Sequence, residues 1–171
     1  MAEFGIAAGV LQVAGFGAAL GSALWTYVKD VRNANKDLES LAGQVAATAT
    51  CLDSVGSLLQ DPQTKALPTA KLYEDTRAVS EGCREVFQEL ETAVQSAKAG
   101  SRSKGSGKIQ MPWEKRVQWP LNSSRPKEIQ QVLQHYNSVL HFMLSVLQIA
   151  ESRRAACVFS LTIVFVMLIG Y

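Results

Sequence analysis

An apolar segment without any charged residue runs from Phe4 to Val28, between the flanking charges Glu3 and Lys29. A surface helix of a soluble protein carries charge on one face, so we expect this segment to be buried in protein or in lipid. It is long enough to cross a bilayer, which needs about 20 apolar residues. Three interpretations remain open: a central bundle helix buried on all sides, a permanent membrane span, or a buried helix that can transfer to a membrane.

Glycines interrupt this segment at positions 5, 9, 15, 17 and 21. The spacings Gly5-x3-Gly9 and Gly17-x3-Gly21 allow the backbones of neighbouring helices to approach closely. Because glycine costs a helix about 1 kcal/mol relative to alanine, the segment is a poor autonomous helix. A break near Gly15 or Gly17 into two short helices is consistent with the pattern.

Three amphipathic patterns follow, with apolar residues at steps of three or four, as in helices that bury one face. The first spans residues 36–60, and the N-cap Asn35 and the early carboxylates Asp37 and Glu39 favour its start. The second spans residues 69–98, and the third begins at Ser124 and Pro126. The predicted buried stripes are Leu38, Leu41, Val45, Thr48, Leu52, Val55 and Leu59; Leu72, Thr76, Val79, Cys83, Val86, Leu90, Val94 and Ala97; and Ile129, Val132, Leu133, Tyr136, Val139, Leu140, Met143, Leu147 and Ala150.

The fold class that follows is all-α, an antiparallel bundle of four to six helices with the apolar N-terminal helix at its centre. The bundle domain would comprise residues 1–154. A flexible linker at about 99–112 would interrupt it, since AGSRSKGSGKIQ is rich in glycine and serine. Trp113 to Leu121 reads as a short helix or turn whose tryptophans pack back onto the bundle.

The linker region is strongly basic, with eight Lys or Arg and one acid, Glu114, between Lys98 and Lys127. The run is a solvated loop or a patch for anionic lipid, where each cation contributes about 1 kcal/mol. The spacing Gly100-x4-Gly105 does not make a phosphate-binding loop, because Ser106 stands where the lysine must be. Nucleic acid is disfavoured, because one short loop with Trp113 and Trp119 nearby is a poor stacking platform.

The last segment, residues 155–171, is again apolar and uncharged, and Arg153 and Arg154 precede it. As a helix it would be about 25 Å long, at the lower limit for a bilayer core of about 30 Å. By the positive-inside tendency the bundle would lie on the cytosolic side with the tail inserted. The alternative is that the preceding helix continues into a tail that packs against another subunit.

The composition of the 171 residues, with a net charge of +2, offers few residues for a disulfide, metal or catalytic site. The three cysteines, Cys51, Cys83 and Cys157, are far apart, and no CxxC occurs, so a disulfide framework or a zinc site is not expected. Cys83 falls on a predicted apolar stripe and reads as a core thiol. His135 and His141 fall on different helix faces and read as surface or rim residues.

Several stretches together resemble a known family: TYVKDVRNANKDLESLAGQVAATATCLDSV, EGCREVFQELETAV and VQWPLNSSRPKEIQQVLQHYNSVLHFMLSVL. Residues 1–150 resemble the fungal N-terminal domain of STAND proteins, in the HeLo-like group of helical bundles. The more specific marks are the Asn33-Ala34-Asn35 turn, Cys83 and Trp119. The resemblance implies an intracellular helical bundle of signalling receptors, with related domains acting as cell-death effectors whose N-terminal helix is thought to enter membranes.

The expected function is a non-enzymatic signalling or cell-death-type domain, without cofactor or metal, that associates with membranes and like domains. The alternative is a soluble adaptor that binds other proteins and no lipid. An enzyme is disfavoured because the sequence shows no paired carboxylates, Ser/His/Asp set, metal cluster or phosphate loop. The candidate membrane contacts are Phe4, Ile6, Val10, Leu11, Val158, Phe159, Leu161, Ile163, Phe165 and Leu168. The candidate contacts to anionic lipid are Lys98, Arg102, Lys104 and Lys108.

Overall fold

The computed structural model describes the backbone of residues 2–30, 36–61, 70–102 and 125–169, and the side chains of residues 5–29, 36–61, 70–96 and 126–153. The described residues form four helices and no strand. They are α1 (Ala2–Asp30), α2 (Lys36–Gln60), α3 (Ala70–Arg102) and α5 (Arg125–Ile169). The predicted turn at 113–121 lies outside the described residues.

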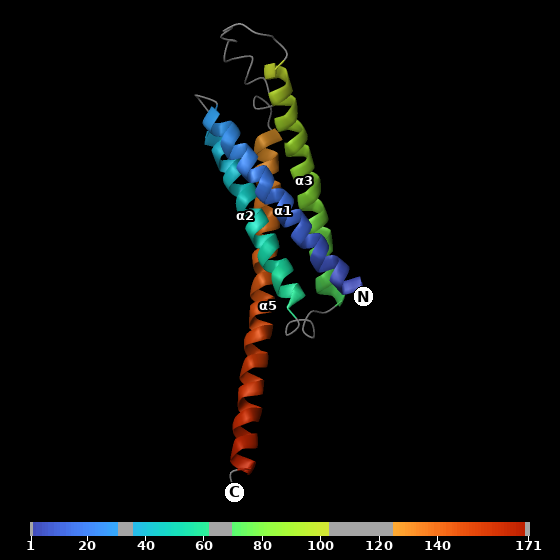
Figure 1. Ribbon diagram of the computed structural model, residues 1–171, viewed down its shortest axis with the longest axis vertical. Helices are drawn as coiled ribbons and strands as arrows, with labels where there is room; N and C mark the ends of the chain where they lie inside the picture. Colours follow the sequence, from blue (N-terminus) through green and yellow to red (C-terminus); the bar gives the residue numbers. More distant parts are fainter. Residues whose placement is uncertain (1, 31–35, 62–69, 103–124, 170–171) are drawn as a thin grey trace.

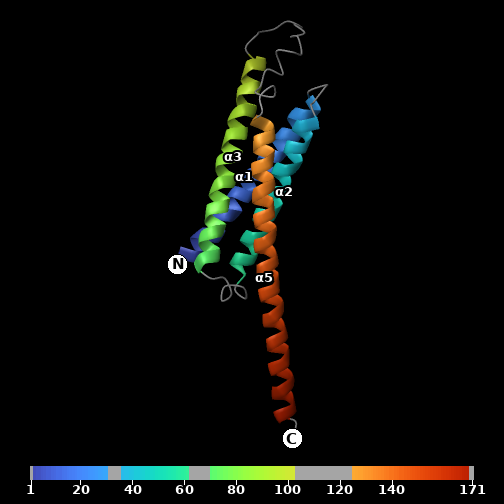
Figure 2. The ribbon, with the colours of Figure 1, turned by 180° about the vertical axis from the view of Figure 1, so that it is seen from behind.

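Successive helices run in alternating directions, so the protein is an all-helical antiparallel bundle (Figures 1 and 2). Helix α1 packs most extensively on α2 and also on α3, and α5 packs on α2 and α3. Helices α2 and α3 come close at few points, and within the described part of the chain the backbones of α1 and α5 do not approach each other closely. The four helices therefore form a ring in the order α1, α2, α5, α3.

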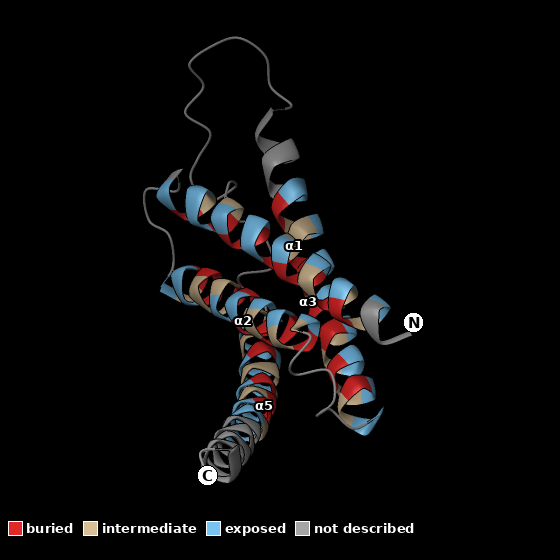
Figure 3. Ribbon diagram, turned by 60° about the horizontal axis from the view of Figure 1, so that its bottom comes forward, coloured by how far each residue is buried: buried red, intermediate tan, exposed pale blue. Residues whose placement is uncertain are grey.

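The core lies inside this ring, where the buried faces of the helices turn toward one another (Figure 3). All seven residues of the stripe predicted on α2 are buried, which confirms that stripe. On α3, Cys83 and Leu90 are buried as predicted, and Phe87 and Tyr73, which lie outside the predicted stripe, join them. The ring of Phe87 packs edge-on against Phe16 of α1, with centroids 6.2 Å apart.

Small residues bring α1 and α2 close together. A Cβ atom added at Gly17 would collide with the Phe87 ring and lie 3.0 Å from Ala49 Cβ, and one added at Gly21 would lie 3.5 Å from Ala46 Cβ. The Gly17-x3-Gly21 pair therefore serves the close approach that its spacing predicts. The Gly5-x3-Gly9 pair does not, because nothing lies within 4 Å of a Cβ added at either position.

Two expectations about α1 are wrong. The helix is continuous from Ala2 to Asp30, without a break near Gly15 or Gly17, because packing on α2 and α3 compensates for the low helix propensity of glycine. It is also not the central element but one corner of the ring. Its outward face is exposed, with Trp25 40% accessible, so α1 is not buried on all sides.

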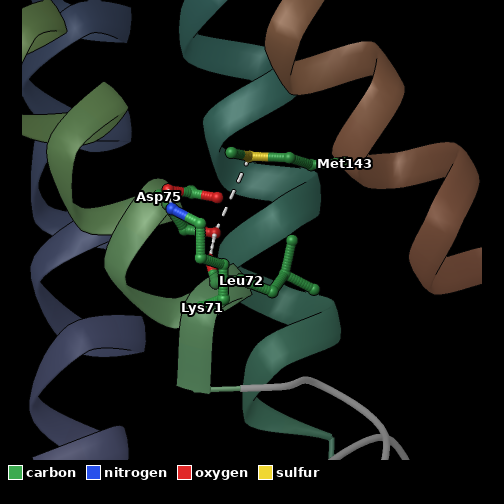
Figure 4. A network of polar contacts seen from close by, with 5 residues as sticks. Lys71, Leu72, Asp75 and Met143 are labelled. Atoms are coloured by element: carbon green, nitrogen blue, oxygen red, sulfur yellow. Dashed lines mark hydrogen bonds and ion pairs between the residues drawn. The ribbon is translucent and has the colours of Figure 1, made fainter.

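Helices α3 and α5 meet through a small polar network in the core. The fully buried Thr76 hydroxyl donates to the carbonyl of Leu72 at 2.7 Å and lies 3.7 Å from Met143 Sδ of α5 (Figure 4). On the exposed side of the same turn, Lys71 pairs with Asp75 at 3.0 Å. The buried hydroxyl is thus satisfied within its own helix, and Thr76 can occupy a core position without an unpaired donor.

Helix α5 is much longer than the other three. It enters the ring at Arg125 and continues as one helix to Ile169, so its C-terminal part extends beyond the bundle (Figure 1). Among its described side chains, which end at Arg153, the last buried one is Leu147. The amphipathic helix and the apolar tail that the sequence presents in succession are therefore one element.

Candidate functional site

A half-open groove of about 720 Å³ lies between the N-terminal half of α1 and α3. Its α1 wall is apolar except for Gln12 and includes Ile6, Val10 and Phe16, with the bare backbone of Gly5 and Gly9 beside them. Its α3 wall is polar and carries Arg77, Glu81, Arg84, Gln88 and Glu91. Arg84 pairs with Glu81, and both side chains are about half exposed. Such a groove suits a helix or peptide with one apolar edge better than it suits a small charged molecule.

The outward face of α1 is uncharged and built of small residues. The exposed positions between its two ends are Gly5, Ala8, Gln12, Gly15, Ala18, Ala19, Ser22, Trp25 and Thr26. Within the described residues, Gly5–Lys29 is the one helix segment long and apolar enough to cross a membrane, a test that core helices of soluble proteins also pass. In this structure its apolar side is occupied by α2 and α3, and Leu24 and Val10 are fully buried.

The predicted membrane contacts of α1 divide between the groove and the core. Ile6 is half-buried beside the groove, Val10 is 1% exposed, and Leu11 packs against Gly56 of α2. Val10 therefore cannot touch lipid in this arrangement, because its periodic position faces the ring interior. The side chain of Phe4 lies outside the described residues, as do those of Val158, Phe159, Leu161, Ile163, Phe165 and Leu168, although the backbone at the latter six is helical.

Of the four predicted lipid-binding cations, two lie on a helix. Helix α3 continues to Arg102, so Lys98 lies on the helix as its predicted bounds imply, whereas Arg102, which was expected in the flexible linker, belongs to the last turn. Their side chains, and Lys104 and Lys108 altogether, lie outside the described residues. Residues 99–102 are helical because nothing in Ala99-Gly100-Ser101-Arg102 forces the chain out of a helix, although glycine weakens it.

The outward face of α5 carries an apolar stripe that the sequence pattern does not separate from the core stripe. Val132, Phe142, Val146 and Ile149 are 38–70% exposed, with Phe142 the most exposed. Val132 was predicted to be buried, and this is wrong: the neighbouring Leu133 faces the core instead. The sequence pattern alone did not identify Phe142, Val146 and Ile149 as surface residues. The available signal was that this helix has more apolar positions than one face can hold.

The described cysteines have the character of core thiols. Cys83 is completely buried, which confirms its predicted core position, and burial raises the pKa of its thiol from 9.0 to about 12. Burial also raises the pKa of Cys51. Since the thiolate is the nucleophile, both shifts oppose reactivity at neutral pH.

One contact involves residue types used in catalysis. His141 is exposed at the rim, as predicted, and its Nε2 lies 3.5 Å from Cys51 Sγ, joining α5 to α2. A nearby histidine can activate a cysteine. Here the pKa of Cys51 is raised rather than lowered, and the groove of α1 and α3 does not include the pair. The geometry thus describes a packing contact with a weak hydrogen bond.

The described residues contain no group of three or more His, Cys, Asp or Glu that could hold a metal ion. No protein-family model, curated protein or solved structure matches the chain. The functional argument therefore depends on its surfaces: the groove between α1 and α3, the uncharged face of α1, and α5 with its exposed stripe and protruding end.

Proposed function

We propose that this protein is a non-enzymatic helical signalling domain, held at a membrane by the C-terminal part of α5 and acting through association with like domains. The observation that carries the proposal is the continuity of α5. One helix runs from the bundle core through Glu151, Arg153 and Arg154 into the uncharged residues 155–169. An apolar helix that leaves its bundle needs another apolar environment, because exposing it to water is unfavourable.

The end of this helix is short for a bilayer but carries the flanking charges of a membrane span. The uncharged residues 155–169 rise about 22 Å, against a hydrocarbon core of about 30 Å, and a short span is accommodated by local thinning of the bilayer and by flanking side chains that reach the headgroups. The arginines at 153 and 154 would lie at the headgroups, where long cationic side chains are favourable. By the positive-inside tendency, the bundle would then face the cytosol, and the basic residues at the end of α3 would be available to anionic lipid.

Helix α1 has a different role in this proposal. It is packed in the ring at rest and would enter lipid only if lipid and oligomer contacts exceed the packing on α2 and α3 that it leaves. Its uncharged outer face supports this role, because no charged side chain between Glu3 and Lys29 would have to be transferred. The resemblance to fungal STAND N-terminal domains points the same way, toward intracellular signalling or cell death.

A second candidate function is a soluble adaptor without a membrane role. The groove between α1 and α3 favours it, because an apolar wall opposite a polar one is typical of surfaces that bind an amphipathic helix. In that case residues 155–171 would pack on another protein subunit. The two candidates differ in whether the chain partitions into lipid bilayers of neutral composition.

Liposome flotation of the full chain tests the proposal. In the test variant, Leu161→Arg and Val164→Arg place two charges in the apolar tail, each opposing insertion by about 3 kcal/mol. In the matched control, Gln131→Arg and Gln134→Arg add the same charge at exposed positions of α5 within the bundle. We expect the unmodified chain and the control to float with neutral liposomes and the test variant to remain in the dense fraction.

Two results would overturn the proposal. If the unmodified chain does not float, the membrane role is wrong and the adaptor function gains support. If the tail variant floats as completely as the control, the membrane element is not the tail, and α1 becomes the constitutive membrane helix. Far-UV circular dichroism of each chain excludes unfolding as the cause of a difference.

A further inference from the structure

The exposed face of α5 lacks the charges that a solvated helix carries. No residue between Glu128 and Glu151 is charged, although this part of α5 forms one outer side of the ring. Phe142 is 70% exposed and Ile149 54% exposed. By contrast, the exposed positions of α3 include Arg77, Glu81 and many other charged residues. The other exposed positions of this part of α5 are Gln, His and Ser, so the apolar surface is a stripe that includes Phe142 and Ile149. An exposed apolar stripe without charge marks a surface that meets another apolar surface.

The spacing of this face is that of a helix-pairing seam. Val132, Val139, Phe142, Val146 and Ile149 fall on one three/four repeat, in which the exposed His135 holds the position between Val132 and Val139. Val139 is half-buried and also packs against the core of the bundle. Small exposed residues flank the seam once per heptad, at Ser138, Ser145 and Ser152. The core seam of α5, with Leu133, Leu140 and Leu147, lies on a different side of the helix. Helix α5 thus carries two seams, of which the bundle buries one and contacts the other through Val139.

We propose that the outward seam of α5 pairs with the same seam of a second copy of this chain, in parallel orientation. An uncharged seam is self-complementary, as a twofold interface must be, whereas a charged seam would repel its copy. The parallel orientation rests on the proposed function, since two chains inserted by the same tail present α5 in the same direction. A bilayer cannot cover the seam instead, because a helix that crosses the membrane at 155–169 cannot also lie along its surface at 132–149.

The area of the seam sets the strength of the pairing. Phe142 has about 140 Å² exposed, given about 200 Å² for a phenylalanine. With three half-exposed aliphatic side chains, the seam falls short of the about 800 Å² per partner of a standard stable interface. Pairing is therefore weak for dilute chains and strong where two chains share one membrane, because anchoring raises their effective concentration.

Disulfide cross-linking of the full chain in liposomes tests this arrangement. All chains carry Cys157→Ser, since that thiol lies in the tail; Cys51 and Cys83 are buried. Single cysteines are introduced at Val132 and at Val146 on the seam, and at Gln134 and Gln148 as exposed controls on the same helix turns. Paired seam positions bring their Cα atoms within the about 4.4–6.8 Å that a disulfide needs, whereas the control positions point away from the partner.

We expect both seam variants to form disulfide-linked dimers at least tenfold more efficiently than the controls. Val132 and Val146 are 14 residues apart, about 21 Å along the helix, so both can pair with themselves only if the helices are parallel. Equal yields at seam and control positions would show random collision and overturn the inference. Cross-linking at only one of the two valines would exclude the parallel arrangement.

A second variant separates pairing from membrane binding. Phe142→Glu, in the Val146→Cys chain, places a charge on the seam at an exposed position, and Gln134→Glu is the matched control. We expect Phe142→Glu to float as the parent does but to lose at least 90% of the cross-linked dimer, and the control to lose none. Retention of the dimer in Phe142→Glu would refute the seam. A failure of the parent to float would refute the proposed membrane role and with it the reason for the parallel orientation, and the absence of seam cross-links in detergent micelles would then refute the pairing as well.

Discussion

The packing of α1 against α2 and α3 predicts opposite outcomes for two neighbouring glycines. A Cβ atom added at Gly17 would collide with the ring of Phe87 and lie 3.0 Å from Ala49 Cβ, whereas a Cβ at Gly15 would meet nothing within 4 Å. Phe87 is fully buried and held against Phe16, so its ring has little room to move. Gly17→Ala therefore forces an overpacked core, and Gly15→Ala does not.

The two substitutions share every effect except this collision. Each gains about 1 kcal/mol from the higher helix propensity of alanine and from the lower entropy of the unfolded chain. Overpacking of a core costs about 1–3 kcal/mol. The free energy of unfolding of Gly17→Ala should therefore lie about 1–3 kcal/mol below that of Gly15→Ala, and Gly15→Ala should be more stable than the unmodified protein.

Urea unfolding of the full chain in a non-ionic detergent, followed by far-UV circular dichroism, measures this difference. If the two variants differ by less than about 0.5 kcal/mol, the tight packing of Gly17 against Phe87 of α3 and Ala49 of α2 is refuted, because propensity alone would make them equal. The same pair bears on release of α1. Gly17→Ala weakens the packing that holds α1 in the ring and should increase its access to lipid, measured as leakage of dye from vesicles.

Three further predictions concern the core and the basic residues. Leu90→Ala should destabilise the protein by about 2–5 kcal/mol in a urea melt, as truncation of a fully buried leucine does; a loss below about 0.5 kcal/mol would contradict its core position. The raised pKa of Cys83 means that unfolding is favoured as pH rises from 9.0 to about 12, by up to ~1.4 kcal/mol per pH unit. Cys83→Ala should flatten this alkaline loss, and an unchanged pH profile would contradict the shift. Neutralising the four basic residues should weaken binding to anionic vesicles with little effect on folding, and added salt should weaken it too. These residues are Lys98, Arg102, Lys104 and Lys108. Unaltered binding in a co-sedimentation assay would remove them from the proposal.

The local periodicity of apolar residues was sufficient to predict the buried side chains of a helix that has a single apolar face. Helix α2 is such a case, since its predicted stripe from Leu38 to Leu59 is entirely buried and its predicted bounds agree with the structure. Helix α5 is not, because it has two apolar seams at similar spacing. Steps of three and four residues fit both seams, and they cannot tell that Leu133 faces the bundle while Val132 faces outward.

The packing of one helix against another could not be predicted from the sequence, for a different reason. The two glycine pairs of α1 have the same spacing, yet Gly17 and Gly21 meet α2 while Gly5 and Gly9 meet no side chain. Which pair is used depends on where α2 crosses α1, and no local pattern encodes this crossing. The contact between Cys51 and His141 spans 90 positions of sequence and depends on the register of α2 against α5 in the same way.

The order of packing around the ring has a consequence for the folding of this chain. The most extensive interface joins α1 and α2, which are consecutive and separated by a short connection. Contacts that are local in sequence form early, because closing a short loop loses little entropy. During synthesis the apolar side of α1 can therefore be covered by α2 well before α5 is complete.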